Sequence, residues 1–135
     1  EIIGWSLSTK HNVNFIINAL FDALAQRNKP KILHSDQGTE YKSTELTKIL
    51  KSNRIKQSMA NKSNPWQNGI QESFYGKFKL ELGHPEIYPT IGQLAEAIAH
   101  QIYYYNNNRI HTAIKCPPTI FYQQYQQKTM TKQIC

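Results

Sequence analysis

The chain has 135 residues, and 39% of them are hydrophobic, which is enough for one compact domain with a core. Sixteen Lys and Arg against nine Asp and Glu give a net charge of +7, which suits a polyanionic partner, although ordinary solvated lysines would give the same number. No apolar run approaches the roughly 20 residues of a membrane span. Cys116 and Cys135 suggest no disulfide framework. We therefore expect a cytoplasmic protein with reduced thiols and no membrane partner.

The first half of the chain alternates strand and helix patterns. Alternating large apolar residues predict a strand over residues 1–8, and apolar residues at helical spacing predict a helix over 12–27, which ends before Pro30. Adjacent Ile32 and Leu33 predict a short buried strand over 31–35 that breaks into a turn. A further helix over 44–51 and a strand over 55–59 follow by the same criteria.

The second half of the chain is mainly helical. After a polar loop over 61–68, a long helix is expected from Gly69, with an apolar stripe of Ile70, Phe74, Phe78 and Leu82. Two more helices are expected over 91–107 and 118–127, the latter opened by a proline. This order predicts an α/β domain with helices layered on a sheet. We expect the domain to span residues 1–127, followed by a C-terminal tail over 128–135.

Three residues in this pattern could carry chemistry. Asp36 follows a buried strand and Glu72 enters a helix after a loop, so the two carboxylates could converge on divalent metal ions, for which hard oxygen ligands select magnesium or manganese. Lys79 lies two helical turns beyond Glu72 and projects from the same face. Each residue alone has a structural explanation: a turn aspartate, a glutamate favoured by the helix dipole, and a surface lysine.

A run of cations lies between these two acids. Between positions 42 and 62 only one acid occurs, Glu45, against six basic residues: Lys42, Lys48, Lys51, Arg54, Lys56 and Lys62. Phosphates could bind there, and a solvated helix face is the equally simple alternative.

The sequence around the acids resembles a known family. The segment His34-Ser35-Asp36-Gln37-Gly38-Thr39-Glu40-Tyr41 resembles the second-aspartate motif of insertion-sequence transposases of the IS3 type, which are related to retroviral integrases. Asn64 to Phe74 resembles their glutamate motif, and Lys79 falls where the family has its basic residue. The closing signature of that family is matched by Tyr105, Asn106, Arg109, His111 and Pro117-Pro118.

The resemblance implies a ribonuclease H-like fold and metal-dependent strand transfer, in which a DNA 3′ hydroxyl attacks a phosphodiester. Asp36 and Glu72 would be the second and third metal ligands of a site that holds two Mg²⁺ or Mn²⁺ ions. Lys79, together with Lys62 and with Asn68 and Gly69 of the loop before the glutamate, would contact DNA. The residues Tyr105, Asn106, Arg109 and His111 would have structural roles, with a turn at Tyr105-Asn106. His34 and Gln37 would lie near the site.

The chain also departs from the family pattern. The first catalytic aspartate of the family lies on a strand that precedes this sequence, and Asp22 is a poor substitute because it belongs to the solvated face of its helix. The ribonuclease H-like sheet is ordered 3-2-1-4-5, and this sequence supplies only strands 3, 4 and 5, so the fold is expected to be incomplete. We therefore expect an N-terminally truncated core that is marginally stable and inactive by itself.

Three functions compete at this point. The first is a DDE transposase core that acts on element ends and target DNA, as at least a dimer, in the bacterial cytoplasm and at the nucleoid when bound to DNA. The second is an inactive remnant with weak, salt-sensitive nucleic-acid binding. The third, a nuclease for RNA–DNA hybrids, shares the fold but lacks the closing signature.

Overall fold

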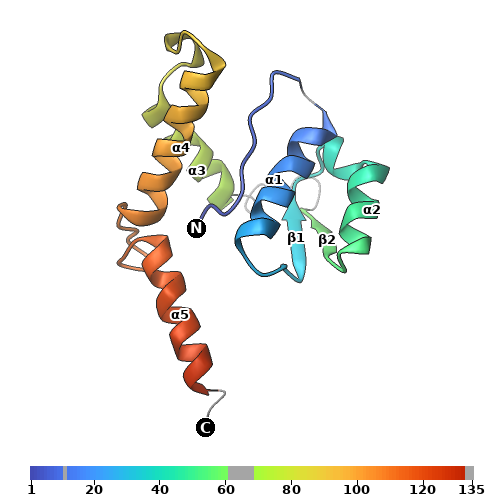
Figure 1. The fold of residues 1–135 in the computed structure, drawn as a ribbon, viewed down its shortest axis with the longest axis vertical. Helices are drawn as coiled ribbons and strands as arrows, with labels where there is room; N and C mark the ends of the chain where they lie inside the picture. The colour runs from blue at the N-terminus through green and yellow to red at the C-terminus, as the bar shows by residue number, and fades with distance from the viewer. Residues whose placement is uncertain (11, 61–68, 133–135) are drawn as a thin grey trace. The chain divides into compact units, whose positions relative to one another are not determined.

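A computed structural model describes residues 1–10, 12–60 and 69–132 of the chain. The chain divides into two compact units (Figure 1). The sheet unit consists of Ile3–Lys77, and the helical unit consists of Glu1–Ile2 together with Phe78–Cys135. Each unit is described below by itself.

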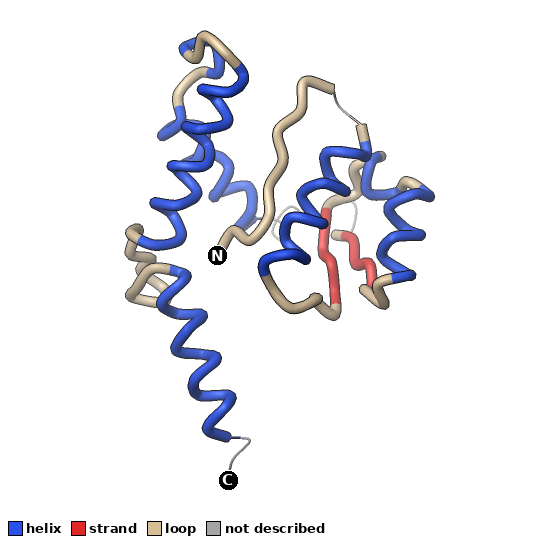
Figure 2. Tube along the Cα trace, in the orientation of Figure 1, coloured by secondary structure: helices blue, strands red, loops and turns tan. Residues whose placement is uncertain are grey.

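The sheet unit contains a two-stranded sheet packed against two helices. Strands β1 (Ile32–Ser35) and β2 (Lys56–Met59) are parallel, with Ile32 paired to Lys56 and Ser35 to Met59. Helix α1 (Val13–Gln26) precedes β1, and helix α2 (Thr44–Ser52) connects the strands, so that β1, α2 and β2 form a βαβ crossover (Figure 2). A short 3-10 helix, Glu40–Lys42, leads into α2.

Both helices of this unit begin at side-chain caps that the sequence supplies. The side-chain oxygen of Asn12 accepts a hydrogen bond from the Asn14 N–H at 3.0 Å, and that of Ser43 accepts one from the Leu46 N–H at 3.3 Å. The apolar faces of α1 and α2 then meet in a small core, in which Leu46 and Leu50 are 0% and 1% exposed. The other core residues are Ile16, Ile17, Leu20 and Ile55.

The helical unit is built from α4 (Ile91–Asn107), α5 (Pro118–Lys132) and the last turn of α3 (Gly69–Leu82), a helix that begins in the sheet unit. Helix α3 is followed by Gly83, whose N–H donates to the Lys79 carbonyl at 3.1 Å and whose φ of +78° suits glycine best. The Thr90 hydroxyl caps α4 by accepting a hydrogen bond from the Gln93 N–H at 3.2 Å. The Gln101 amide donates to the Phe78 carbonyl at 2.9 Å and joins α4 to the end of α3.

The expected strand over residues 1–8 is wrong, because this segment is not part of any sheet in the described structure. A strand needs a neighbouring backbone, and here side chains take that place. The Ile2 N–H donates to the Asn106 side chain in the helical unit at 2.8 Å. The Trp5 N–H donates to the Asp22 carboxylate in the sheet unit at 3.1 Å.

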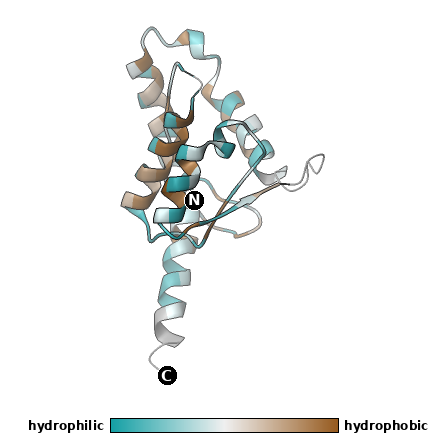
Figure 3. Cartoon of the chain, turned by 90° about the vertical axis from the view of Figure 1, so that its right-hand side faces the viewer, coloured by the Kyte–Doolittle hydropathy of each residue, from teal (hydrophilic) through white to brown (hydrophobic). Residues whose placement is uncertain are grey.

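The two remaining expected strands and the five expected helices are present within a few residues of their expected bounds. The largest difference is at α5, which runs to Lys132 instead of ending at residue 127. Polar residues dominate the sequence of that extension. In Figure 3 the helix that leads down to the C-terminus is largely teal to white, so its described residues are mostly hydrophilic or of intermediate hydropathy. The chain is thus an α/β protein with a small parallel sheet.

Candidate active site

Asp36 lies directly after the carboxyl end of β1, in a turn that holds its backbone and one carboxylate oxygen. Its Oδ1 accepts a hydrogen bond from the Gly38 N–H at 2.9 Å. The preceding Ser35 is buried, and its hydroxyl donates to the Asp36 carbonyl at 2.9 Å. The Asp36 side chain itself is exposed. The turn therefore fixes the direction of a carboxylate that solvent or a ligand can reach.

Polar side chains join the ends of the two strands beside Asp36. The Ala60 N–H donates to the Ser35 carbonyl at 2.8 Å, which continues the parallel pairing by one residue. The Gln37 amide donates to the Ala60 carbonyl at 3.1 Å and accepts from the Lys42 ammonium at 3.3 Å. Gln37 therefore links the turn after β1 to the end of β2 at this edge of the sheet. The sequence alone left its role unassigned.

His34 lies on a different part of the sheet. Its Nδ1 is 3.0 Å from the Ser58 hydroxyl, its register partner on β2. This contact is between neighbouring strands and involves neither Asp36 nor the turn after it. Its geometry is that of a cross-strand polar pair.

Tyr41 connects the Asp36 turn to helix α3. Burial and the nearby Asp36 carboxylate raise the pKa of the Tyr41 hydroxyl above its ordinary value of 10.0, and Tyr75 and Glu40 act in the same direction. Tyr75 lies on α3, one turn after Glu72. Asp36 after β1 and Tyr75 of α3 therefore act in the same direction on the Tyr41 hydroxyl. The backbone of Tyr41 is in turn held by the Gln57 amide, which donates to its carbonyl.

Glu72 is exposed in the first turn of α3, where the helix dipole favours a negative charge. Gly69 is the first residue of this helix, as the helical pattern predicted, whereas the family resemblance placed it in the loop before Glu72. Lys79 is exposed in the last turn of α3, where the helix dipole favours a cation. It lies about two helical turns beyond Glu72 along the same helix. Lys62 and Asn68 lie outside the described residues.

The donor chemistry of Asp36 and Glu72 suits a hard divalent cation. Magnesium is commonly bound by one or two carboxylates, with water and substrate phosphate oxygens as its other ligands. Two exposed carboxylates of the sheet unit match that set. In the described parts of the chain, no group of three or more His, Cys, Asp or Glu side chains is arranged to hold a metal ion.

Two residues of the closing signature, Asn106 and Arg109, form hydrogen bonds with other residues of the helical unit. The Asn106 side chain accepts from the Ile2 N–H and donates to the Ile2 carbonyl, both at 2.8 Å, as a neighbouring strand would. The Arg109 guanidinium binds both carboxylate oxygens of Glu81, at 2.7 and 3.0 Å. Tyr105 and Asn106 lie in the last helical turn of α4, so the expected turn at these two residues is wrong.

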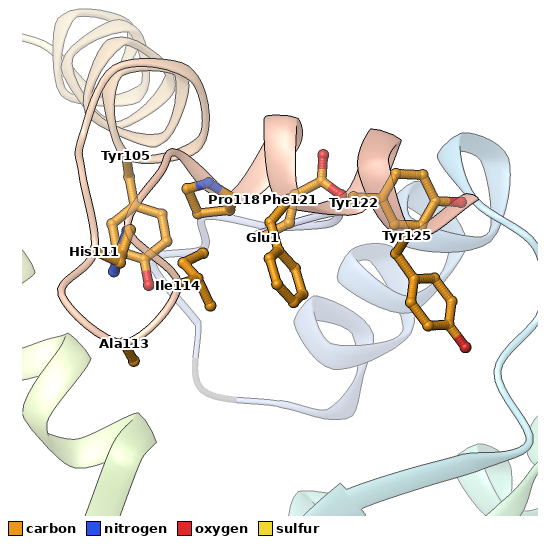
Figure 4. Close-up of a pocket in the computed structure, with 9 residues that line it drawn as sticks. All are labelled: Glu1, Tyr105, His111, Ala113, Ile114, Pro118, Phe121, Tyr122 and Tyr125. Atoms are coloured by element: carbon orange, nitrogen blue, oxygen red, sulfur yellow. The ribbon is translucent and has the colours of Figure 1, made fainter. Parts of the chain in front are cut away.

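A pocket of about 540 Å³ opens beside these residues in the helical unit (Figure 4). Tyr105 and His111 form one side of it, with ring centroids 4.6 Å apart and an interplanar angle of 74°. Phe121 and Tyr125 of α5 line another part. The lining is mainly apolar and aromatic, so this pocket lacks the pair of acids that the candidate metal site needs.

Asp22 has a role that its sequence pattern did not predict. The pattern placed it on a solvated helix face, but the residue is only partly exposed, and its Oδ2 accepts the Trp5 N–H. Its Oδ1 accepts from the Gln26 amide at 2.9 Å. Asp22 therefore fixes the N-terminal segment of the sheet unit on α1. The four-residue spacing with Gln26 indicated the second contact and not the first.

Comparison with solved structures identifies the fold of this chain. The catalytic core domain of HTLV-2 integrase, solved in complex with magnesium, superimposes with a TM-score of 0.65 and 20% identity, over 83% of this chain and 70% of the viral one. The fold is therefore that of the integrase catalytic cores, which is ribonuclease H-like, and the two-stranded sheet is an incomplete version of it.

Sequence comparison agrees with the fold. Two family profiles, each described as integrase core domain, match residues 1–65 and 53–118. A putative transposase of Escherichia coli, InsK of insertion sequence element IS150, is 37% identical over 117 residues. A transposase-like protein of Haemophilus influenzae is 38% identical over 116 residues. The chain belongs to the integrase core family. Within that family it groups with the IS3-type insertion-sequence transposases.

The matched segment is part of longer relatives. The alignments cover 85% of this chain in both cases, but 41% of the E. coli protein and 54% of the H. influenzae protein. The described helices include none that is long and apolar enough to cross a membrane.

Proposed function

We propose that the chain contributes Asp36 and Glu72 to a metal-dependent site for DNA strand transfer, as part of a DDE transposase. The observation that carries this proposal is that two exposed carboxylates of the sheet unit lie at element ends: Asp36 follows β1 and is oriented by the Gly38 N–H, and Glu72 is in the first turn of α3. The matched motifs and the family membership support the same two residues.

The residues of this chain would hold and orient the reacting groups. Asp36 offers a carboxylate oriented by its hydrogen bond to the Gly38 N–H, and Glu72 offers one from a rigid helix. When bound, Mg²⁺ or Mn²⁺ stabilises the attacking and leaving oxygens at the phosphodiester. A complete core of the family adds a further aspartate and holds two ions, and we propose that strand transfer requires that residue too.

DNA contacts would come from the residues around Glu72. Lys79 would bind a phosphate of the element end. Lys62 and Asn68 would contribute contacts from the sequence before α3, and Gly69 from the first position of that helix. We propose element ends and target DNA as substrates. Pairing two ends would require at least a dimer, acting in the cytoplasm and at the nucleoid.

A metal-binding cycle tests whether the two acids share an ion. Mn²⁺ binding is measured by calorimetry for the chain, for Asp36→Asn, for Glu72→Gln and for the double variant. The side-chain oxygen of the substituted asparagine can still accept the Gly38 N–H, so the turn is retained. Each single change should weaken binding by about tenfold or more, because even outer partners of metal ligands contribute that much. If the two acids share one ion, the fold-loss of Mn²⁺ affinity in the double variant should be smaller than the product of the two single-variant fold-losses.

The matched control is Glu45→Gln. Glu45 is also exposed, lies in the first turn of a helix of the sheet unit, and has no proposed ligand role. Its loss should leave Mn²⁺ binding unchanged. Equal weakening by Glu45→Gln, or strictly multiplicative losses for Asp36 and Glu72, would contradict a shared site.

A joining assay separates the enzyme from the inactive remnant. The full transposase, with the Asp36→Asn change, should lose magnesium-dependent joining of element ends while it retains DNA binding. Salt-sensitive DNA binding without joining by the unchanged protein would support the remnant instead.

A further inference from the structure

Four cations gather at the edge of the sheet where both strands begin. Because β1 and β2 are parallel and Ile32 pairs with Lys56, the two strands start at the same edge. The Lys56 N–H donates to the Lys31 carbonyl, and the Arg54 N–H donates to the Lys51 carbonyl, both at 2.9 Å. All four side chains are exposed. We call Lys31, Lys51, Arg54 and Lys56 the basic edge.

The charge of the basic edge is not neutralised within the described part of the sheet unit. Among the residues that the structure describes, none of these four cations forms an ion pair, whereas Arg109 in the helical unit is paired with Glu81. Glu45 is in the first turn of α2, about 9 Å along the helix from Lys51. The dipole of α2 favours Lys51 at its C-terminus, but it does not account for the lysines at the two strand starts.

Arg54 occupies this edge in a backbone conformation that disfavours it. Its φ is +56°, in the left-handed region, and it follows the cap residue of α2, where glycine or asparagine is the usual choice. Arginine offers a planar guanidinium with five donors, which matches a phosphate group. The strained position is thus occupied by the side chain best suited to a polyphosphate ligand.

We propose that the basic edge is a second DNA-contact surface, which binds the phosphate backbone of duplex DNA outside the reacting phosphodiester. Asp36 follows the opposite end of β1, and a four-residue strand spans about 13 Å, so the basic edge is separate from the candidate metal site. Phosphate contacts position a duplex without reading its sequence. The inference rests on the proposed function only in taking DNA as the partner.

The salt dependence of DNA binding tests the proposal. Binding of the chain to a labelled duplex of arbitrary sequence is measured by fluorescence anisotropy between about 50 and 200 mM salt. Arg54→Gly should reduce the slope of log K against log salt by about 0.9, and the Lys31→Gln, Lys56→Gln double variant should reduce it by about 1.8. Arg54→Gly should also melt at the same or a higher temperature than the unchanged chain, because glycine adopts the positive φ without strain.

Lys115→Gly is the matched control. Lys115 is an exposed cation with a φ of +57° in the helical unit, so this variant removes the same charge and the same backbone strain at a residue that does not belong to the basic edge. Its salt slope should equal that of the unchanged chain. An equal loss of slope in Lys115→Gly would overturn the proposal, and so would an unchanged slope in Arg54→Gly.

Two further measurements keep this inference distinct from the proposed function. Asp36→Asn should weaken Mn²⁺ binding by about tenfold or more while its salt slope stays the same. Mn²⁺ binding that depends on Asp36, together with an unchanged salt slope in Arg54→Gly, would therefore refute the basic edge and leave the proposed function intact. Vesicles with anionic phospholipid serve as the competing partner. If Arg54→Gly loses vesicle binding and keeps its DNA slope, the surface is for lipid and the proposal is wrong.

Discussion

Gly4 lies where the N-terminal segment of the sheet unit packs directly against α1. A Cβ added at Gly4 would lie 2.6 Å from the Ala23 nitrogen and 2.7 Å from the Ala23 Cβ, and it would also collide with the Ala19 carbonyl oxygen. These atoms belong to a helix and cannot turn away as a flexible side chain would. Gly4→Ala must therefore push the segment off the helix.

The magnitude follows from two contributions. Overpacking of this kind costs about 1–3 kcal/mol. The displaced segment also weakens the hydrogen bond from the Trp5 N–H to the Asp22 carboxylate, and such bonds to charged groups contribute about 1.5–3 kcal/mol. Because the segment can relax and water can replace part of the bond, we expect Gly4→Ala to lower the free energy of unfolding by about 2–4 kcal/mol.

Urea denaturation followed by circular dichroism at the helix band measures this change. Gly76→Ala is the control, since a Cβ at Gly76 meets nothing within 4 Å and the residue lies inside α3. The control should raise the free energy of unfolding by about 0.5–1 kcal/mol, because alanine is the better helix former. The same substitution would thus have opposite signs at the two glycines. If Gly4→Ala is as stable as the unchanged chain, the close packing of this segment on α1 is refuted.

The other predictions concern the candidate site and the closing signature. Asp36→Asn should lower the pKa of Tyr41 toward 10.0, as measured by ultraviolet titration of tyrosinate. An unchanged pKa would show that the Asp36 carboxylate does not act on the Tyr41 hydroxyl. Because folding raises the pKa of Tyr41, its contribution to stability is complete below pH 10.0 and is lost as the pH rises through the folded-state value, so alkaline melts should show a smaller decline for Tyr41→Phe. Asn106→Ala removes two backbone contacts and should cost about 1–3 kcal/mol in denaturant titrations, whereas a loss near zero would make those contacts incidental. Arg109→Met should cost no more than about 1 kcal/mol, because the pair with Glu81 is partly exposed, and a larger loss would indicate a stronger structural role.

Local sequence patterns determined most of the secondary structure. The apolar spacing of α1, the Ser43 cap of α2 and the proline that opens α5 are properties of neighbouring residues, and each element lies within a few residues of its expected bounds. The sequence motifs also led to the family assignment, which fold and sequence comparison then confirmed. The positions of Asp36 after a strand and Glu72 in a helix followed from the same local signals.

Only the tertiary structure decided what these elements contact. The N-terminal segment has the alternation of a strand, yet its backbone binds Asp22 and Asn106, which lie 17 and 104 residues away along the chain from their partners. Alternation reports which side chains avoid water, but it carries no information about whether another backbone lies alongside. In the same way, the raised pKa of Tyr41 and the need for glycine at position 4 arise from atoms that only folding brings together.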